Sequence, residues 1–256
     1  MNTEQFNNKK LNETEFSSGQ VKLQSTPPYL IFLTSYKCNM RCLFCSERGD
    51  EPDFNLNIYK NLLDTDLIEA IKKADHLFYT GWGEVLLFPG VKELLDFLNH
   101  SVPTGTKVFT TNGSPLNQDL ILRLIEGKYS LQISLHASNA LLHRLLTQSE
   151  YFDRIVEQLR YIVSLKEERK LPLPSLTLIF VITSLNIENL PDFIDFAGQL
   201  GVNSVICHYL TIFKPEHVKI SCFFLKKTTN SMTALVEIRC FLKRWLINFI
   251  IFSFEL

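Results

Sequence analysis

The chain has 256 residues, of which 46% are hydrophobic and 21% charged, and its formal net charge is −1. This composition is typical of a globular protein with one large domain or two small ones, and the balanced charge gives no sign of a nucleic-acid-binding face. The polar segment 1–26 lacks the apolar core of a secretory signal, and no window reaches the ~18 apolar residues that a membrane-spanning helix needs. We therefore expect a cytoplasmic protein with a flexible leader over residues 1–26.

Apolar segments typical of strands alternate along the chain with stretches of helical periodicity. The expected strands are 29–35, 76–80, 107–110, 130–135, 175–183 and 202–207. The expected helices are 58–74, 91–99, 116–125, 139–168 and 186–199. This alternation favours right-handed βαβ units and a parallel sheet. Six such units over residues 27–215 form either an open doubly wound α/β sheet or a partial, TIM-like (β/α)6 barrel.

The alternation stops after about residue 213. Residues 219–256 carry six basic and two acidic side chains and end in an aromatic and aliphatic stretch, 245–252. We treat 216–256 as an atypical C-terminal tail. It could be a packed helix that closes the open end of a barrel, because apolar stripes usually belong to a core. A peripheral membrane segment or the remnant of a truncated domain are the alternatives.

Three of the six cysteines, Cys38, Cys42 and Cys45, follow the first expected strand with C-x3-C-x2-C spacing. Thiolates at this spacing can hold three irons of one iron–sulfur cube and leave the fourth iron open. A zinc site is an alternative, although structural zinc usually takes four ligands. A redox dithiol formed by Cys42 and Cys45 is another. The other three cysteines are scattered, without paired spacing, and have no assigned role: Cys207, Cys222 and Cys240.

Three further motifs follow expected strands, and in a parallel α/β fold the loops after strand C-termini gather on one face. Each motif also has a plain structural interpretation: a glycine-rich strand-to-loop turn, an Asn-Gly turn and a structural histidine. Together with the cysteines they indicate a binding site on this face. The motifs are Gly81-Trp82-Gly83-Glu84, Thr110-Thr111-Asn112-Gly113 and Ser134-Leu135-His136.

In this order the motifs resemble those of the radical S-adenosylmethionine (SAM) superfamily over roughly residues 27–215. The three cysteines, with Phe44 before the third, match the family's signature loop, and segment 81–84 resembles its Gly-Gly-Glu-Pro motif. Segment 133–137, followed by His143, is similar to the branch that often carries a C-terminal SPASM extension. Departures are Trp82 and Val85 in the second motif. Thr147 also stands where some relatives place a carboxylate-binding Arg, with Arg144 one turn earlier.

The resemblance implies that the three cysteines ligate a [4Fe–4S] cluster and that the amino and carboxylate groups of SAM complete its fourth iron. One electron would then cleave SAM to methionine and a 5′-deoxyadenosyl radical that abstracts hydrogen from a substrate. Glu84 would accept from the SAM ammonium, Gly83 would allow close approach of its methionine end, and Phe44 would face the adenine. Ser134 or His136 would bond the ribose or carboxylate. The implied SAM-binding residues are Phe44, Gly81, Trp82, Gly83, Glu84, Thr111, Asn112, Ser134 and His136.

Our prediction is a single α/β domain, a partial (β/α)6 barrel that acts on a peptide or small metabolite. The cluster would need an external one-electron reductant of the flavodoxin or ferredoxin type. A second, auxiliary cluster is not expected, and no nucleic-acid partner is expected. Two rival interpretations stay open: a non-catalytic, truncated module that binds cluster and SAM, and a zinc-stabilised binding protein.

Overall fold

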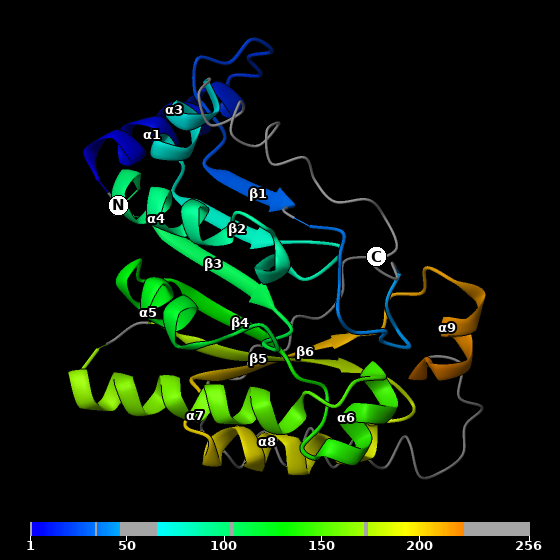
Figure 1. The fold of residues 1–256 in the computed structure, drawn as a ribbon. Helices are drawn as coiled ribbons and strands as arrows, with labels where there is room; N and C mark the ends of the chain where they lie inside the picture. The colour runs from blue at the N-terminus through cyan, green and yellow to red at the C-terminus, as the bar shows by residue number, and fades with distance from the viewer. Residues whose placement is uncertain (1, 34, 47–65, 103–104, 172–173, 223–256) are drawn as a thin grey trace. The chain divides into compact units, whose positions relative to one another are not determined.

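The computed structural model describes residues 2–33, 35–46, 66–102, 105–171 and 174–222 (Figure 1). Six strands form one sheet in the order β1-β2-β3-β4-β5-β6, which leaves β1 and β6 at its two edges. The strands are β1 (Tyr29–Leu33), β2 (His76–Thr80), β3 (Thr106–Thr111), β4 (Ser130–Ser134), β5 (Leu176–Ile182) and β6 (Ser204–Tyr209). The predicted parallel α/β fold of the partial-barrel type is confirmed, and all six strands lie where the sequence predicted them.

Helices separate the strands, as expected. They are α1 (Thr3–Ser17), α3 (Asp66–Lys73), α4 (Val91–Ser101), α5 (Gln118–Glu126), α6 (Ala140–Thr147), α7 (Phe152–Arg169), α8 (Leu190–Gln199) and α9 (Pro215–Ile220), with 3-10 turns η1 (Val85–Leu87) and η2 (Ile187–Asn189). No helix in this described part is both long and apolar enough to cross a membrane. The first half of the expected helix 58–74 and most of the tail, including Cys240 and the stretch 245–252, lie outside the described residues.

The described residues form two compact units. The first contains 2–33, 35–38, 66–102, 105–111 and 115–131, and therefore β1 to β3 with α1, α3, α4 and α5. The second contains 39–46, 112–114, 132–171 and 174–222, and therefore β5, β6 and the helices from α6 onward. The boundary falls within β4, between residues 131 and 132.

The core of the first unit is built on the parallel strands β1, β2 and β3. Tyr79 and Phe109 occupy paired positions on neighbouring strands, and their rings stack with centroids 4.8 Å apart. Phe109 also meets the edge of Tyr129 at 5.2 Å. Beside these rings Lys107 is buried, donating from Nζ to the Val102 carbonyl at 2.9 Å, and burial lowers its pKa to about 8.

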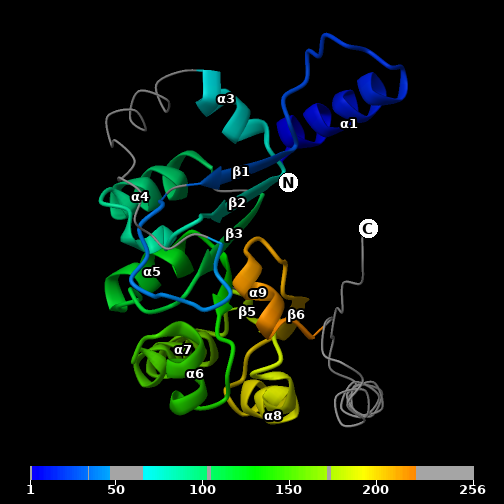
Figure 2. The same cartoon turned by 90° about the vertical axis from the view of Figure 1, so that its right-hand side faces the viewer.

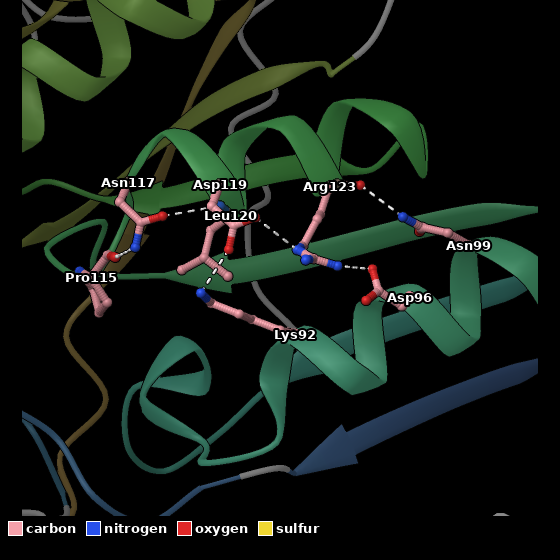
Figure 3. A network of polar contacts seen from close by, with 8 residues as sticks. All are labelled: Lys92, Asp96, Asn99, Pro115, Asn117, Asp119, Leu120 and Arg123. Atoms are coloured by element: carbon pink, nitrogen blue, oxygen red, sulfur yellow. Dashed lines mark hydrogen bonds and ion pairs between the residues drawn. The ribbon is translucent and has the colours of Figure 1, made fainter.

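Helices α4 and α5 pack side by side along β2 and β3 (Figure 2). A network of exposed charges joins them (Figure 3). Arg123 of α5 forms ion pairs with Asp96 of α4 and, at 3.1 Å, with Asp119, while Lys92 of α4 reaches Asp119 at 2.7 Å. The hydrogen bond from Lys92, aided by Arg123, lowers the pKa of Asp119. Because these groups face water, the network contributes little to stability, and buried leucines on both helices supply most of it.

Residues 3–17 of the expected leader form α1. Asn2 and Gln5 make a capping box at its start. Gln5 and Asn8 then donate to the carbonyls of Ala74 and Lys73, at the end of α3, at 2.9 and 3.4 Å. Those carbonyls lack partners inside α3, so polar side chains attach this helix where an apolar stripe would normally do so. Apolar periodicity, the signal used above, does not detect such a contact.

In the second unit, β5 and β6 are parallel, and α7 and α8 lie on the same side of β5 (Figure 1). Phe193 of α8 meets Phe180 of β5 with ring centroids 4.7 Å apart. The expected helix 139–168 is instead two helices, because Gln148 adopts a left-handed conformation (φ 52°) that ends α6. α7 then begins at Phe152.

Candidate active site

In the first unit, Gly83 supports the backbone that leads into the cysteine loop, which we define as residues 36–45. A Cβ at Gly83 would lie 2.2 Å from the Lys37 carbonyl oxygen and 2.5 Å from the carbonyl carbon of Tyr36. Backbone bonds tie the same segments together: Gly83 N–H donates to Ser35 at 3.0 Å, and Glu84 N–H donates to Lys37 at 2.7 Å. Gly83 is therefore required by the chain's own backbone, a role that the motif comparison did not predict.

Glu84 is buried, and its carboxylate organises the turn after β2. Oε1 accepts from the Leu86 N–H at 3.0 Å, which caps η1, and it also accepts a short hydrogen bond from the Thr111 hydroxyl at the end of β3. Two residues predicted to bind SAM are thus brought together within the first unit. Trp82, between the two glycines, is 43% exposed.

In the second unit, the main chain of the cysteine loop is anchored to the end of α6. The N–H groups of Arg41 and Leu43 donate to the carbonyls of Thr147 and Leu146, each at 2.9 Å. The last carbonyls of a helix lack partners within it, so the loop completes α6 while α6 fixes the loop. One turn further on, Cys45 N–H donates to the Cys42 carbonyl at 3.1 Å.

Three polar side chains form a closed ring of hydrogen bonds in the second unit, and only one of them, Asn112, was predicted as a site residue. Asn39 Nδ2 donates to Ser114 Oγ at 2.7 Å, and Ser114 Oγ donates to Asn112 Oδ1 at 2.7 Å. Asn112 Nδ2 returns to Asn39 Oδ1 at 3.0 Å. The position of Asn39 inside the cysteine motif was the available signal for its role.

His136 is buried and neutral. Its Nδ1 accepts from the Val181 N–H at 3.1 Å, so the proton of the neutral ring lies on Nε2. Burial, with smaller contributions from His143 and His208, lowers the pKa of His136 to about 3. The ring meets Phe44 of the cysteine loop edge-on, with centroids 4.7 Å apart. His136 and Phe44, both predicted site residues, are therefore in contact.

Asn186 was not identified by the sequence analysis. Its side-chain amide, beside His136, makes two donated and two accepted hydrogen bonds. Nδ2 donates to the carbonyls of His136 and Val181, each at 3.0 Å. Oδ1 accepts from the N–H and hydroxyl of Thr183 at 2.8 and 2.9 Å. The residue thus joins the loop after β4 to the loop after β5. Ser134, at the end of β4, is half-buried, and its hydroxyl has no hydrogen-bond partner in the described part of the chain.

Further along the second unit, Thr147 and Arg144 occupy different surroundings. Thr147 is buried and bonds the His143 carbonyl at 2.8 Å and the Ser149 hydroxyl at 2.9 Å. Arg144 is exposed and pairs with Glu150 at 3.1 Å. Burial also lowers the pKa of His143, to about 4.

An open groove of about 620 Å³ runs beside Leu43 of the cysteine loop. The residues that line it are Leu43, Leu141, Arg144, Leu145, Gln148, Ser149 and Glu150.

The thiols fit an iron–sulfur cluster by their chemistry. Cys38, Cys42 and Cys45 are half-buried cysteines outside any disulfide, and thiolate sulfur is the ligand that such clusters use. No three His, Cys, Asp or Glu side chains among the described residues are already gathered as a metal site. Burial raises the pKa of Cys207 and of Cys222 to about 11, which makes these two thiols poor ligands without further change.

The family model for the radical SAM superfamily matches residues 32–197, and the chain belongs to this superfamily. Its members are enzymes that bind a [4Fe–4S] cluster and SAM. The structure resembles that of Streptococcus suis SuiB bound to S-adenosylmethionine, with a TM-score of 0.70 and 15% identity over 96% of this chain and 54% of SuiB. It also resembles anSMEcpe with bound AdoMet, with a TM-score of 0.59 and 14% identity over 88% of this chain and 63% of that one. At these identities the likeness establishes the fold.

Two curated relatives are similar in sequence. The tungsten-containing aldehyde ferredoxin oxidoreductase cofactor-modifying protein of Pyrococcus furiosus is 24% identical over 200 residues, which are 74% of this chain and 53% of that protein. A probable GTP 3′,8-cyclase of Sulfurisphaera tokodaii is 29% identical over 178 residues, 67% of this chain and 52% of that protein. The chain thus spans about half the length of these relatives.

Proposed function

We propose that this chain holds a [4Fe–4S] cluster on Cys38, Cys42 and Cys45, binds SAM beside it, and starts a radical reaction on a substrate. The carrying observation is the three-thiol loop itself, which lies within the matched family domain and is anchored to the end of α6. When bound, the cluster supplies the electron that splits SAM into methionine and a 5′-deoxyadenosyl radical. Because a complete set of metal ligands rarely exists in an unfolded chain, cluster binding also stabilises the folded loop.

The predicted SAM-binding residues keep their roles as part of this proposal, refined by their contacts. A carboxylate can accept about four hydrogen bonds, so Glu84 can accept from the SAM ammonium while it caps η1 and bonds Thr111. His136 is a neutral donor through Nε2–H, which suits a ribose oxygen or the SAM carboxylate. Ser134 offers a hydroxyl, and Phe44 offers a ring face for the adenine.

A peptide or a small molecule is the proposed substrate class. SuiB has been solved bound to its precursor peptide SuiA, and anSMEcpe with bound peptides, whereas curated relatives are probable GTP 3′,8-cyclases. The electron comes from outside, from a flavodoxin-type or ferredoxin-type protein. The cysteines outside any disulfide suit a reducing, cytoplasmic compartment.

The test is anaerobic reconstitution of the full chain with iron and sulfide, followed by chemical reduction and addition of SAM. Mass spectrometry should detect 5′-deoxyadenosine, and Cys42→Ala should abolish it. Cys207→Ala is the matched control, since it removes a thiol outside the loop and should leave the product unchanged. Zinc in place of iron would refute the proposal, and a stable cluster that yields no 5′-deoxyadenosine would support the non-catalytic module instead.

A further inference from the structure

The ring formed by Asn39, Asn112 and Ser114 has a single consistent pattern of donors and acceptors. The Asn39 amide donates to Ser114 Oγ, the Ser114 hydroxyl donates to Asn112 Oδ1, and the Asn112 amide donates to Asn39 Oδ1, at 2.7, 2.7 and 3.0 Å. Each of the three side chains donates one hydrogen bond and accepts another, and hydrogen bonds in such a cycle strengthen one another. The ring therefore holds one arrangement of the three side chains.

The backbone after β3 is shaped to make this ring. Gly113 adopts a φ of +78°, and a Cβ there would lie 3.1 Å from the side chains of Ile133 and Ile155. This conformation returns Ser114 to Asn112, whose Oδ1 also accepts from the Ser114 N–H at 2.9 Å. Ser114 is 1% exposed, so its hydroxyl has little access to water as a substitute partner.

Asn39 is the only member of the ring that belongs to the cysteine loop, and it directly follows Cys38 in the sequence. The next fixed points in the loop are Arg41 and Leu43, whose N–H groups bond the end of α6. The segment that joins the first and second cysteines is thus held at both of its ends within the second unit. A flexible segment there would have to be ordered at the moment of cluster binding, which weakens binding.

We propose that Asn39, Asn112 and Ser114 are positioning residues that fix the cysteine loop for cluster assembly. The inference rests on the proposed function, in that the loop is taken to carry the cluster. Asn112 would then hold the cysteine loop in place through Asn39, in addition to any contact that it makes with SAM. It also assigns roles to Asn39 and Ser114 that the fold alone does not require.

The first measurement uses the apoprotein and needs no iron. Ser114→Ala removes the hydroxyl that joins the two amides, and Asn39→Ala removes the loop's side of the ring. Each substitution breaks two of the three partly buried bonds of the ring. This loss should raise the open population of the loop about tenfold, and the alkylation rates of Cys38 and Cys42 with it. Cys207, on β6, is the internal reference. Ser164→Ala is the matched control, because Ser164 bonds only Tyr161 one turn earlier in α7.

The second measurement uses the reconstituted holoprotein. Both variants should hold less iron per chain, and the electron paramagnetic resonance signal of the reduced cluster should broaden and respond less to SAM. The loss in the double variant should be smaller than the sum of the two single losses, because both substitutions remove the Asn39–Ser114 bond. Additive effects, or alkylation rates and spectra equal to those of the unaltered chain, would overturn the inference. If the unaltered chain takes up no iron, the proposed function fails, and the alkylation rates still decide the positioning role.

Discussion

Gly83 shows how a single missing methyl group decides the path of the chain. Gly83, in the turn after β2, lies against the peptide of Tyr36 and Lys37, so a side chain at this position meets backbone atoms that cannot rotate away. A flexible side chain could move aside, but a main-chain carbonyl moves only with its whole loop.

We expect Gly83→Ala to lower the free energy of unfolding of the apoprotein by about 1–3 kcal/mol, the usual effect of overpacking. Cluster uptake should fall with it, because the shifted backbone leads into Cys38. Gly198→Ala in α8 is the control: no atom lies within 4 Å of the added Cβ, and alanine favours a helix, so stability should stay equal or rise. Urea unfolding monitored by circular dichroism measures both. Equal effects of the two substitutions would contradict the steric explanation.

His136 makes stability depend on pH. Its pKa in the folded chain is about 3 against an ordinary 6.5, so below pH 6.5 the unfolded chain binds the proton more readily. Its contribution is complete above pH 6.5 and is lost as the pH falls towards 3. His143, with a pKa of about 4, acts in the same direction.

Thermal melts between pH 4 and pH 8 should therefore show a falling Tm below about pH 6.5. His136→Asn should weaken this fall, because an amide oxygen can still accept from Val181 N–H but has no proton to gain. The part due to His143 should persist. A variant whose Tm falls as steeply as that of the unaltered chain would assign the acid sensitivity elsewhere.

At the scale of single elements, the short helix α6 links the cysteine loop to the rest of the second unit. Asn139 caps its first turn, accepting from Leu142 N–H at 2.9 Å, and its last carbonyls hold Arg41 and Leu43. A change at the start of α6 should therefore reach the cysteine loop through the helix.

Asn139→Ala should lower the free energy of unfolding by about 1 kcal/mol, the usual effect of losing an N-cap. It should also raise the alkylation rate of Cys42 in the apoprotein. Asn117→Ala removes the corresponding cap of α5, from Leu120 N–H at 3.1 Å, and should have a similar effect on stability without changing the thiol. Equal thiol reactivity in the two variants would show that α6 does not transmit the change.

At the scale of the whole molecule, the structure leads us to expect a protein whose stability depends on its cofactor. A ligand that binds the folded state alone stabilises it in proportion to the logarithm of its excess over Kd. The cluster should bind only when the cysteine loop is folded, because an unfolded chain rarely holds a preformed set of metal ligands.

Removal of iron with a chelator under anaerobic conditions should lower the Tm of the full chain. It should also raise the alkylation of Cys38, Cys42 and Cys45 far more than that of Cys207. The same treatment of Cys42→Ala, which lacks a ligand, should change little. An unchanged Tm after complete iron removal would separate cluster binding from folding.

The sequence by itself determined the order and type of the elements and the family. Strand and helix periodicities are local, and cysteine spacing is read directly from the chain, so the six strands, most helices and the three thiols were all predicted. The split of 139–168 into α6 and α7 was missed because Gln148 ends a helix without a glycine or proline to mark it. The helix at 3–17 was missed because its attachment is polar.

Only the tertiary structure decided what the site residues touch. The contact of Gly83 with a backbone far away in sequence, the bonds of Glu84 to Leu86 and Thr111, and the neutral state of His136 all depend on folding. Ser114 and Asn186 belong to no apolar pattern and nothing local marks them, whereas Asn39 is marked only by its place inside the cysteine motif. The physical reason is the same in each case. A hydrogen bond or a steric contact joins particular atoms, and the sequence specifies which residues are present but not which of their atoms meet until the chain has folded.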